Sequence, residues 1–266
     1  MGYHRFCGGS KIPTYDTILL CYPVPVEYDR YIYPPYDAPL ADAYDGRFES
    51  VYVIFHPFAS VPDNLSWKAT KQYPSDEQIL SHGTKCSWAQ VAAQTGLSTC
   101  CKLNHALLTS TESIAPELCD YPARDDMQSY LQAESVWMPV QGRFEPLLQM
   151  DFLAAFQAAG QEELIFVPEF PHTDPIQLLH VSRLRNRKDP FPSRGTLLAP
   201  DESFLLTVDW DSFFTLFYGP RAFVTEVVRK QHLEGFFATA TTEHFWFNYS
   251  LGCCVITLEP EVWPAA

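Results

Sequence analysis

The chain has 266 residues and a formal net charge of −14, a balance that argues against nucleic acid as a partner because each phosphate contact normally uses a cation. Hydrophobic residues make up 47% of the chain and charged residues 19%, which excludes a disordered protein and predicts a globular core. No apolar run is long enough to cross a bilayer and the start carries no secretory signal, so we expect a cytoplasmic protein without membrane contact.

Eight cysteines and 22 prolines are spread along the chain. Without an export signal, we expect the cysteines to be reduced and to serve as small buried residues. The prolines predict short helices and many irregular connections. We expect a single domain that spans residues 1–266.

The N-terminal segment, residues 1–46, is rich in proline and tyrosine. We predict that it is extended and irregular and that it packs on the core. The continuous apolar run Ser50–His56 ends at Pro57 and predicts a strand that is buried on both faces. The segment Pro74–Leu80 has the residues of a helix start.

Residues 87–108 predict a helical hairpin. Val91, Ala92 and Gly96 also match the apolar, small and turn positions of a helix-turn-helix, although Leu103 comes one place late. Lys102 is the only lysine or arginine of this segment. We therefore favour a structural hairpin and keep a degenerate DNA-binding motif as an alternative.

Residues 145–259 predict the α/β half of the core. Glu145–Ala159 has helical spacing and is followed by Gly160, which favours a helix end. Leu164–Val167 predicts a strand that ends at Pro168. The basic stretch Arg183–Arg194 predicts a solvated loop, with docking of an anionic ligand as an alternative.

The most aromatic stretch lies between Phe204 and Tyr249. Ser203–Val208 predicts a strand, and Ser212–Tyr218, apolar on most faces, predicts a short buried helix that Gly219-Pro220 ends. A one-sided apolar stripe then predicts a second helix, formed by Phe223, Val224, Val227 and Val228. Three further runs predict the last strands: Gly235–Phe237, His244–Phe247 and Cys253–Leu258.

These elements predict an α+β protein, a single mixed α/β domain with a largely antiparallel or mixed sheet.

One candidate metal site follows the predicted strand Leu164–Val167. Glu169, His172 and Asp174 lie in a loop bounded by prolines, at the end of a strand where α/β proteins often bind ligands. Carboxylates and an imidazole can hold a divalent metal or relay protons. Their spacing matches no established metal motif, and we predict no other cofactor.

A second candidate group is Glu243 and His244, with His232 and Glu234 nearby in sequence. Aromatic neighbours can shift the proton affinity of His244 by desolvation, and general acid-base catalysis is therefore one hypothesis. The alternative is that His244 is a hydrogen-bonded packing residue.

The chain resembles a family of uncharacterised bacterial proteins of unknown function. The resemblance rests on scattered blocks over about half of the chain: Trp88–Leu108, Glu163–Pro171, Asp209–Phe214, Glu234–Phe237 and His244–Trp246. It implies a bacterial, cytoplasmic protein and transfers no site residue.

The function is therefore predicted only in outline. We favour a binding protein that is not an enzyme and that takes a basic protein partner or a second copy of itself, and an immunity protein that neutralises a toxin is one version. The alternatives are a metal-assisted small-molecule hydrolase and a DNA-binding regulator.

Overall fold

The computed structural model describes residues 26–35, 38–209 and 212–244. This part of the chain is an α+β fold built on two antiparallel sheets, which confirms the predicted class. The strands of the larger sheet are β1 (Ser50–Phe55), β5 (Glu163–Pro168), β6 (Gln177–His180), β7 (Gly195–Leu198), β8 (Leu205–Val208), β9 (Phe214–Gly219) and β10 (Gly235–Phe237). Their spatial order is β10-β1-β9-β8-β7-β5-β6, and each neighbouring pair is antiparallel.

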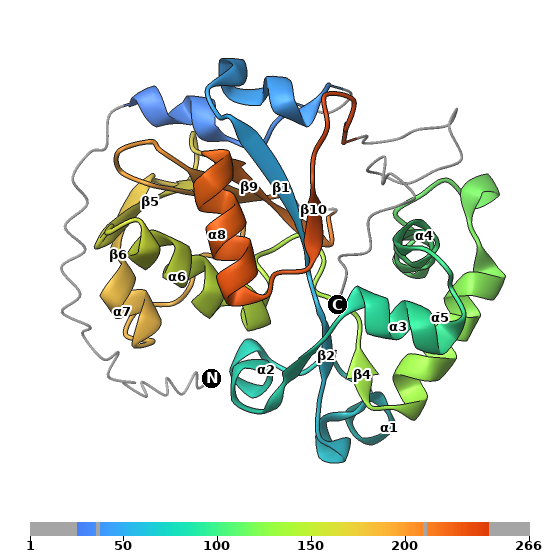
Figure 1. The fold of residues 1–266 in the computed structure, drawn as a ribbon. Coiled ribbons are helices and arrows are strands. Elements are labelled where there is room, and N and C mark those ends of the chain that lie inside the picture. The colour runs from blue at the N-terminus through green and yellow to red at the C-terminus, as the bar shows by residue number, and fades with distance from the viewer. Residues whose placement is uncertain (1–25, 36–37, 210–211, 245–266) are drawn as a thin grey trace, which may run out of the picture.

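A smaller sheet lies below the large one (Figure 1). Its strands are β2 (Phe58–Ser60), β3 (Thr84–Cys86) and β4 (Val136–Trp137), in the order β3-β2-β4. The α-helices are α1 (Trp67–Thr70), α2 (Asp76–His82), α3 (Trp88–Thr95), α4 (Cys100–Ser110), α5 (Tyr121–Ala133), α6 (Gln149–Ala158), α7 (Val181–Arg185) and α8 (Arg221–Gln231). The 3-10 helices are η1 (Val26–Tyr31), η2 (Leu40–Gly46), η3 (Asp63–Leu65), η4 (Pro116–Leu118) and η5 (Pro146–Leu148).

The large sheet buries both of its faces. Strand β1 shows this directly, because Val51, Val53 and Phe55 belong to one core cluster while Tyr52 and Ile54 belong to the other. Helices α6, α7 and α8 supply the second cluster, and η1, η2 and α3 to α5 supply the first. The predicted burial of this strand on both faces is confirmed.

Two helix starts follow from the sequence. Ser75 and Ser87 each accept a hydrogen bond from the backbone amide three residues later, and Gln78 and Gln90 reach back to complete a capping box. Such a box satisfies two amides that the first helical turn leaves unpaired. Such boxes begin α2, within the helix start predicted at 74–80, and α3, within the hairpin predicted at 87–108.

The predicted helix over Ser212–Tyr218 is wrong. Residues 214–219 form β9, and its six residues are all buried between β1 and β8. A short run that is apolar on every side fits a doubly buried strand as well as a buried helix, since neither leaves a polar face. The following helix, with its apolar stripe, is confirmed as α8.

Two irregular segments are more ordered than predicted. The described part of residues 1–46 forms η1 and η2, whose turns bring Tyr31 and Leu40 into the core. The basic stretch 183–194 starts inside α7, because burial of Val181 and Leu184 holds a helical turn there. The predicted strands beyond His244, at 245–247 and 253–258, lie outside the described residues.

None of the helices within the described ranges has the length and apolarity needed to cross a membrane.

Candidate functional site

The predicted metal residues occupy the turn between β5 and β6. Glu169 is half-buried and pairs with Arg194, with 3.2 Å between its Oε2 and Nη1. His172 and Asp174 are exposed. Within residues 26–35, 38–209 and 212–244, no three histidine, cysteine, aspartate or glutamate side chains are grouped to hold a metal ion. The turn therefore does not bring these three residues together as a set of ligands.

His244 is buried beside aromatic side chains. Its Nδ1 lies 2.8 Å from the Tyr33 hydroxyl, and the ring of Phe214 meets it edge-on at 5.2 Å between centroids. Burial lowers the pKa of His244 to about 3, so the imidazole is neutral at physiological pH. Glu243 bridges to Pro39 through the backbone. These contacts tie the end of the described chain to the N-terminal segment.

The other two members of this group lie elsewhere. The carboxylate of Glu234 accepts the backbone amides of Trp88 at 2.7 Å and Ala89 at 2.9 Å, at the start of α3. A carboxylate is favourable there because the first amides of a helix are unpaired and the helix dipole is positive. Glu234 therefore holds α3 against the sheet, and His232, at the end of α8, is exposed.

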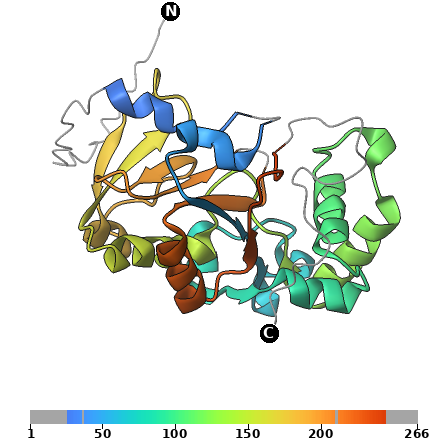
Figure 2. The same cartoon turned by 45° about the horizontal axis from the view of Figure 1, so that its top comes forward.

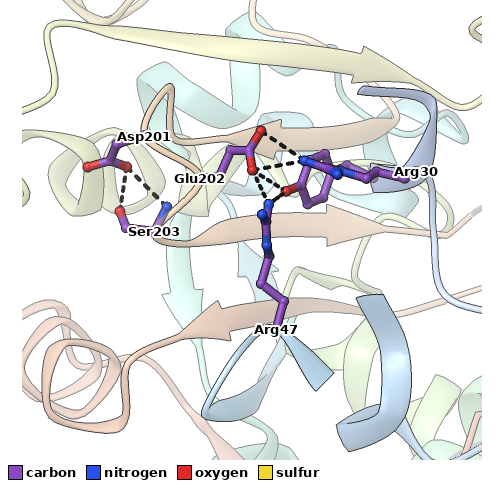
Figure 3. Close-up of polar contacts among 6 residues, drawn as sticks. Arg30, Arg47, Asp201, Glu202 and Ser203 are labelled. Atoms are coloured by element: carbon purple, nitrogen blue, oxygen red, sulfur yellow. Dashed lines mark hydrogen bonds and ion pairs between the residues drawn. The ribbon is translucent and has the colours of Figure 1, made fainter. Parts of the chain in front are cut away.

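The structure also reveals a polar cluster that the sequence did not indicate. We call Arg30, Tyr31, Arg47 and Glu202 the clasp (Figure 3). Tyr31 donates to Glu202 Oε2 at 2.7 Å and Arg30 reaches the same oxygen at 3.0 Å, while Arg47 contacts both Tyr31 and Glu202. Partial burial alone would raise the pKa of Glu202, but the hydrogen bonds from Tyr31 and Arg47 outweigh it and lower the pKa.

The clasp joins the N-terminal segment to the β7–β8 turn. Glu202 sits in the left-handed backbone region at φ 57°, and the neighbouring Asp201 accepts from Ser203 N and Oγ at 3.1 and 2.6 Å (Figure 3). The contacts of Glu202 span 155 to 172 residues of sequence. No local sequence pattern indicates contacts between residues so far apart in the chain, and the sequence analysis therefore missed the clasp.

Replacing Tyr31 with phenylalanine tests the clasp. The variant loses the hydroxyl that bonds Glu202, and we expect the free energy of unfolding to fall by about 1 kcal/mol, since the acceptor is charged but partly exposed to solvent. Urea denaturation followed by circular dichroism measures the loss. Tyr28→Phe, on the same 3-10 helix, is the matched control. Equal losses in the two variants would show that the hydroxyl does not hold the segment.

A groove lies where α4 ends and α5 begins. Its volume is about 580 Å³. Two side chains of α4 hold the connection between the helices, because Thr109 Oγ1 accepts from Asp120 N at 3.1 Å and the His105 ring contacts the Leu118 carbonyl. The lining residues are Thr109, Ser110, Glu112, Ile114, Ala115, Pro116, Glu117, Cys119, Tyr121, Arg124 and Gln128.

The charge of this groove is acidic. Glu112 and Glu117 are exposed at its wall. Arg124 is the one cation among the described lining residues, and Asp125 engages it through two hydrogen bonds of 2.9 and 2.6 Å. Tyr121 is 48% exposed, and the guanidinium of Arg124 lies 4.8 Å from its ring centroid. The groove thus presents two carboxylates and an accessible aromatic ring.

The predicted helical hairpin over residues 87–108 contains α3 and most of α4. Helix α4, which would be the recognition helix of a DNA-binding motif, buries seven of its eleven residues. Lys102 is the exposed cation that it offers. This face has little to present to a phosphate backbone.

Comparison with known proteins places the chain in a family. A family model described as "Protein of unknown function (DUF2711)" matches residues 36–248. The chain belongs to this family. No curated protein and no solved structure matches it.

The predicted resemblance to a family of unknown function is thereby confirmed. The residues that match DUF2711 include all ten described strands, the groove, Glu202 and His244. They do not include Arg30, Tyr31 or Tyr33. Residues that precede the matched region therefore supply Arg30 and Tyr31 of the clasp and the hydroxyl partner of His244.

Proposed function

We propose that this chain is a binding protein of the bacterial cytoplasm, not an enzyme, and that its acidic groove holds a basic segment of a protein partner. An immunity protein that binds a basic toxin is one version of this role. We also propose that two copies of the chain associate, through a surface distinct from the groove.

The groove carries the proposal. Its volume of about 580 Å³ lies within the usual range for ligand sites, roughly 300–1,000 Å³. Glu112 and Glu117 face solvent, while the cation of the groove, Arg124, is already paired with Asp125. A lysine or arginine side chain would meet two carboxylates and the exposed ring of Tyr121, which are favourable neighbours for a cation.

The residues around the groove are also acidic. Asp120, Asp125 and Asp126 follow along the start of α5, and the whole chain carries a net charge of −14. A field of one sign raises the rate at which an oppositely charged partner arrives. Basic polypeptides therefore fit this surface better than anionic ligands.

A peptide titration tests the groove. The probe is a fluorescent lysine-rich peptide, and anisotropy measures its binding at low and high salt. We expect the double variant Glu112→Gln/Glu117→Gln to bind about tenfold more weakly, because two surface charge pairs are lost. The control, Glu77→Gln/Glu162→Gln, changes the net charge equally at exposed sites away from the groove.

The control decides between a site and a general charge effect. If both double variants weaken binding equally, the peptide responds only to net charge and the groove has no special role. If the peptide binds the wild type without saturation, the proposal also fails. Selective loss in the groove variant, reproduced by Tyr121→Ala, supports it.

Less evidence supports the two alternatives, the metal-assisted hydrolase and the DNA-binding regulator. The hydrolase hypothesis needs Glu169 as a ligand, but that carboxylate is paired with Arg194. The regulator hypothesis needs an exposed, cationic α4, and this helix is mostly buried.

A further inference from the structure

The large sheet has an exposed edge at β6. Among the described strands, β6 pairs only with β5, in the register Leu164↔Leu179 and Ile165↔Leu178. A strand at the edge of a sheet carries unpaired backbone donors and acceptors along its outer side, which another strand can use. The edge lies at the opposite end of the molecule from α3 to α5 (Figures 1 and 2).

The edge also exposes apolar side chains. Leu178 is 40% exposed, and Phe170, in the turn that leads to β6, is 61% exposed. Proteins commonly protect an edge strand with lysine, proline or an inward charge. The sequence of β6, Gln177-Leu178-Leu179-His180, has none of these. Within the part of the chain that the structure describes, this edge is therefore open to further strand pairing.

We propose that two copies of this chain pair through β6 to form a two-fold dimer with one continuous antiparallel sheet. A two-fold axis perpendicular to the sheet at Leu178 sets this residue opposite its counterpart and Gln177 opposite Leu179 of the second copy. Residues directly opposite one another in an antiparallel pair lie on the same face. The two Leu178 side chains then extend the apolar row that continues through Ile165.

Charge favours a second copy at this place. Residues 162–194, which include the neighbouring strand β5, contain five lysine or arginine residues and five aspartate or glutamate residues, a net charge of zero, whereas the whole chain carries −14. Two copies of an acidic protein repel least where their local charge is not acidic. The acidic groove lies at the other end, so this dimer leaves it open and does not depend on it.

The test uses the full-length chain in sedimentation velocity over a range of concentrations. We expect a dimer at micromolar concentration, and a dissociation constant at least about tenfold higher for Leu178→Lys, which places two like charges opposite one another. Met150→Lys is the matched control because Met150 is also 40% exposed, on α6. Circular dichroism checks that both variants fold.

Cysteine cross-linking tests the register. Opposed residues in such a pair have Cα atoms roughly 4.5–5.5 Å apart, within the range that a disulfide spans. On mild oxidation we expect Leu178→Cys to give a covalent dimer, and Met150→Cys to give no more than the wild type with its native cysteines.

Three outcomes would overturn the proposal. One is a dimer that Leu178→Lys leaves unchanged, since its interface lies elsewhere. A second is a monomer whose 177–180 amides exchange rapidly with deuterium, which means that the edge is free for a strand of another protein. The third is a monomer with protected 177–180 amides, which means that another segment of this chain covers the edge.

Discussion

Replacing Trp88 with alanine is expected to lower the free energy of unfolding by about 3–5 kcal/mol. Trp88 is 1% exposed, and its ring stacks on Phe55 with 4.5 Å between centroids. Its Nε1 donates to the carbonyl of His56 at 2.7 Å. The alanine variant leaves a cavity between α3 and the sheet, and it leaves that buried carbonyl without its donor.

Urea denaturation followed by far-ultraviolet circular dichroism measures this loss without relying on tryptophan emission. Trp67→Ala is the matched control, because Trp67 is 41% exposed and loses far less buried surface. Trp88→Phe keeps most of the ring and removes the donor, so its loss is expected to be smaller than that of Trp88→Ala. Similar losses for Trp88→Ala and Trp67→Ala would mean that α3 is not anchored by Trp88.

Acidification is expected to destabilise the fold through buried histidines. His56 is fully buried, with Nδ1 3.1 Å from the Val140 carbonyl and Nε2 2.9 Å from the Thr215 hydroxyl. Burial lowers its pKa from 6.5 to about 4. The unfolded chain therefore binds a proton more readily than the folded chain between these two values.

The sign follows from this difference in proton binding. The contribution of His56 to stability is complete above pH 6.5 and is lost as the pH falls through about 4. At about 1.4 kcal/mol per pKa unit, the change amounts to about 3 kcal/mol. His244, whose burial lowers its pKa to about 3, acts in the same direction.

Glu145 acts in the opposite direction. Burial raises its pKa from 4.5 to about 7, although the amides of Val140 and Leu147 donate to its carboxylate. Its contribution is complete below pH 4.5 and is lost as the pH rises through about 7. We therefore expect Glu145→Gln to make the rise of stability between pH 4.5 and 7 steeper.

Urea denaturation at a series of pH values checks these expectations. His56→Gln should flatten the acid side of the profile, while His82→Gln, at an exposed histidine, should leave it as in the wild type. An unchanged profile in His56→Gln would show that His56 is not the group whose protonation destabilises the fold.

Sequence patterns predict an element correctly here where the apolar residues define which of its faces are buried. The unbroken apolar run of β1 specifies burial on both faces, and the one-sided stripe of α8 specifies an amphipathic helix. Prediction fails at residues 212–218, because Phe213, Phe214, Leu216 and Phe217 leave no polar face from which to read a period. Length and composition alone do not separate a buried strand from a buried helix.

The groove and the clasp are harder to predict from the sequence than the fold, for a physical reason. The groove is made by a connection, residues 111–120, whose shape depends on hydrogen bonds such as that between Thr109 and Asp120. The clasp joins Arg30 to Glu202 across 172 residues. Single-sequence patterns report local periodicity, whereas both features depend on which distant segments the folded sheet brings together.

The position of β1 in the sheet also affects how the chain folds during its synthesis. This strand lies between β9 and β10, and Ser50 meets Gly219 across 169 residues of sequence. During synthesis, β1 leaves the ribosome long before β9 and β10 have been translated. Until then its apolar residues have neither of these strands to pack against. Strand pairs between residues so far apart in sequence form slowly, and the unpaired strand is exposed to aggregation until they form. Nascent chains that stop before β9 are thus expected to need chaperones.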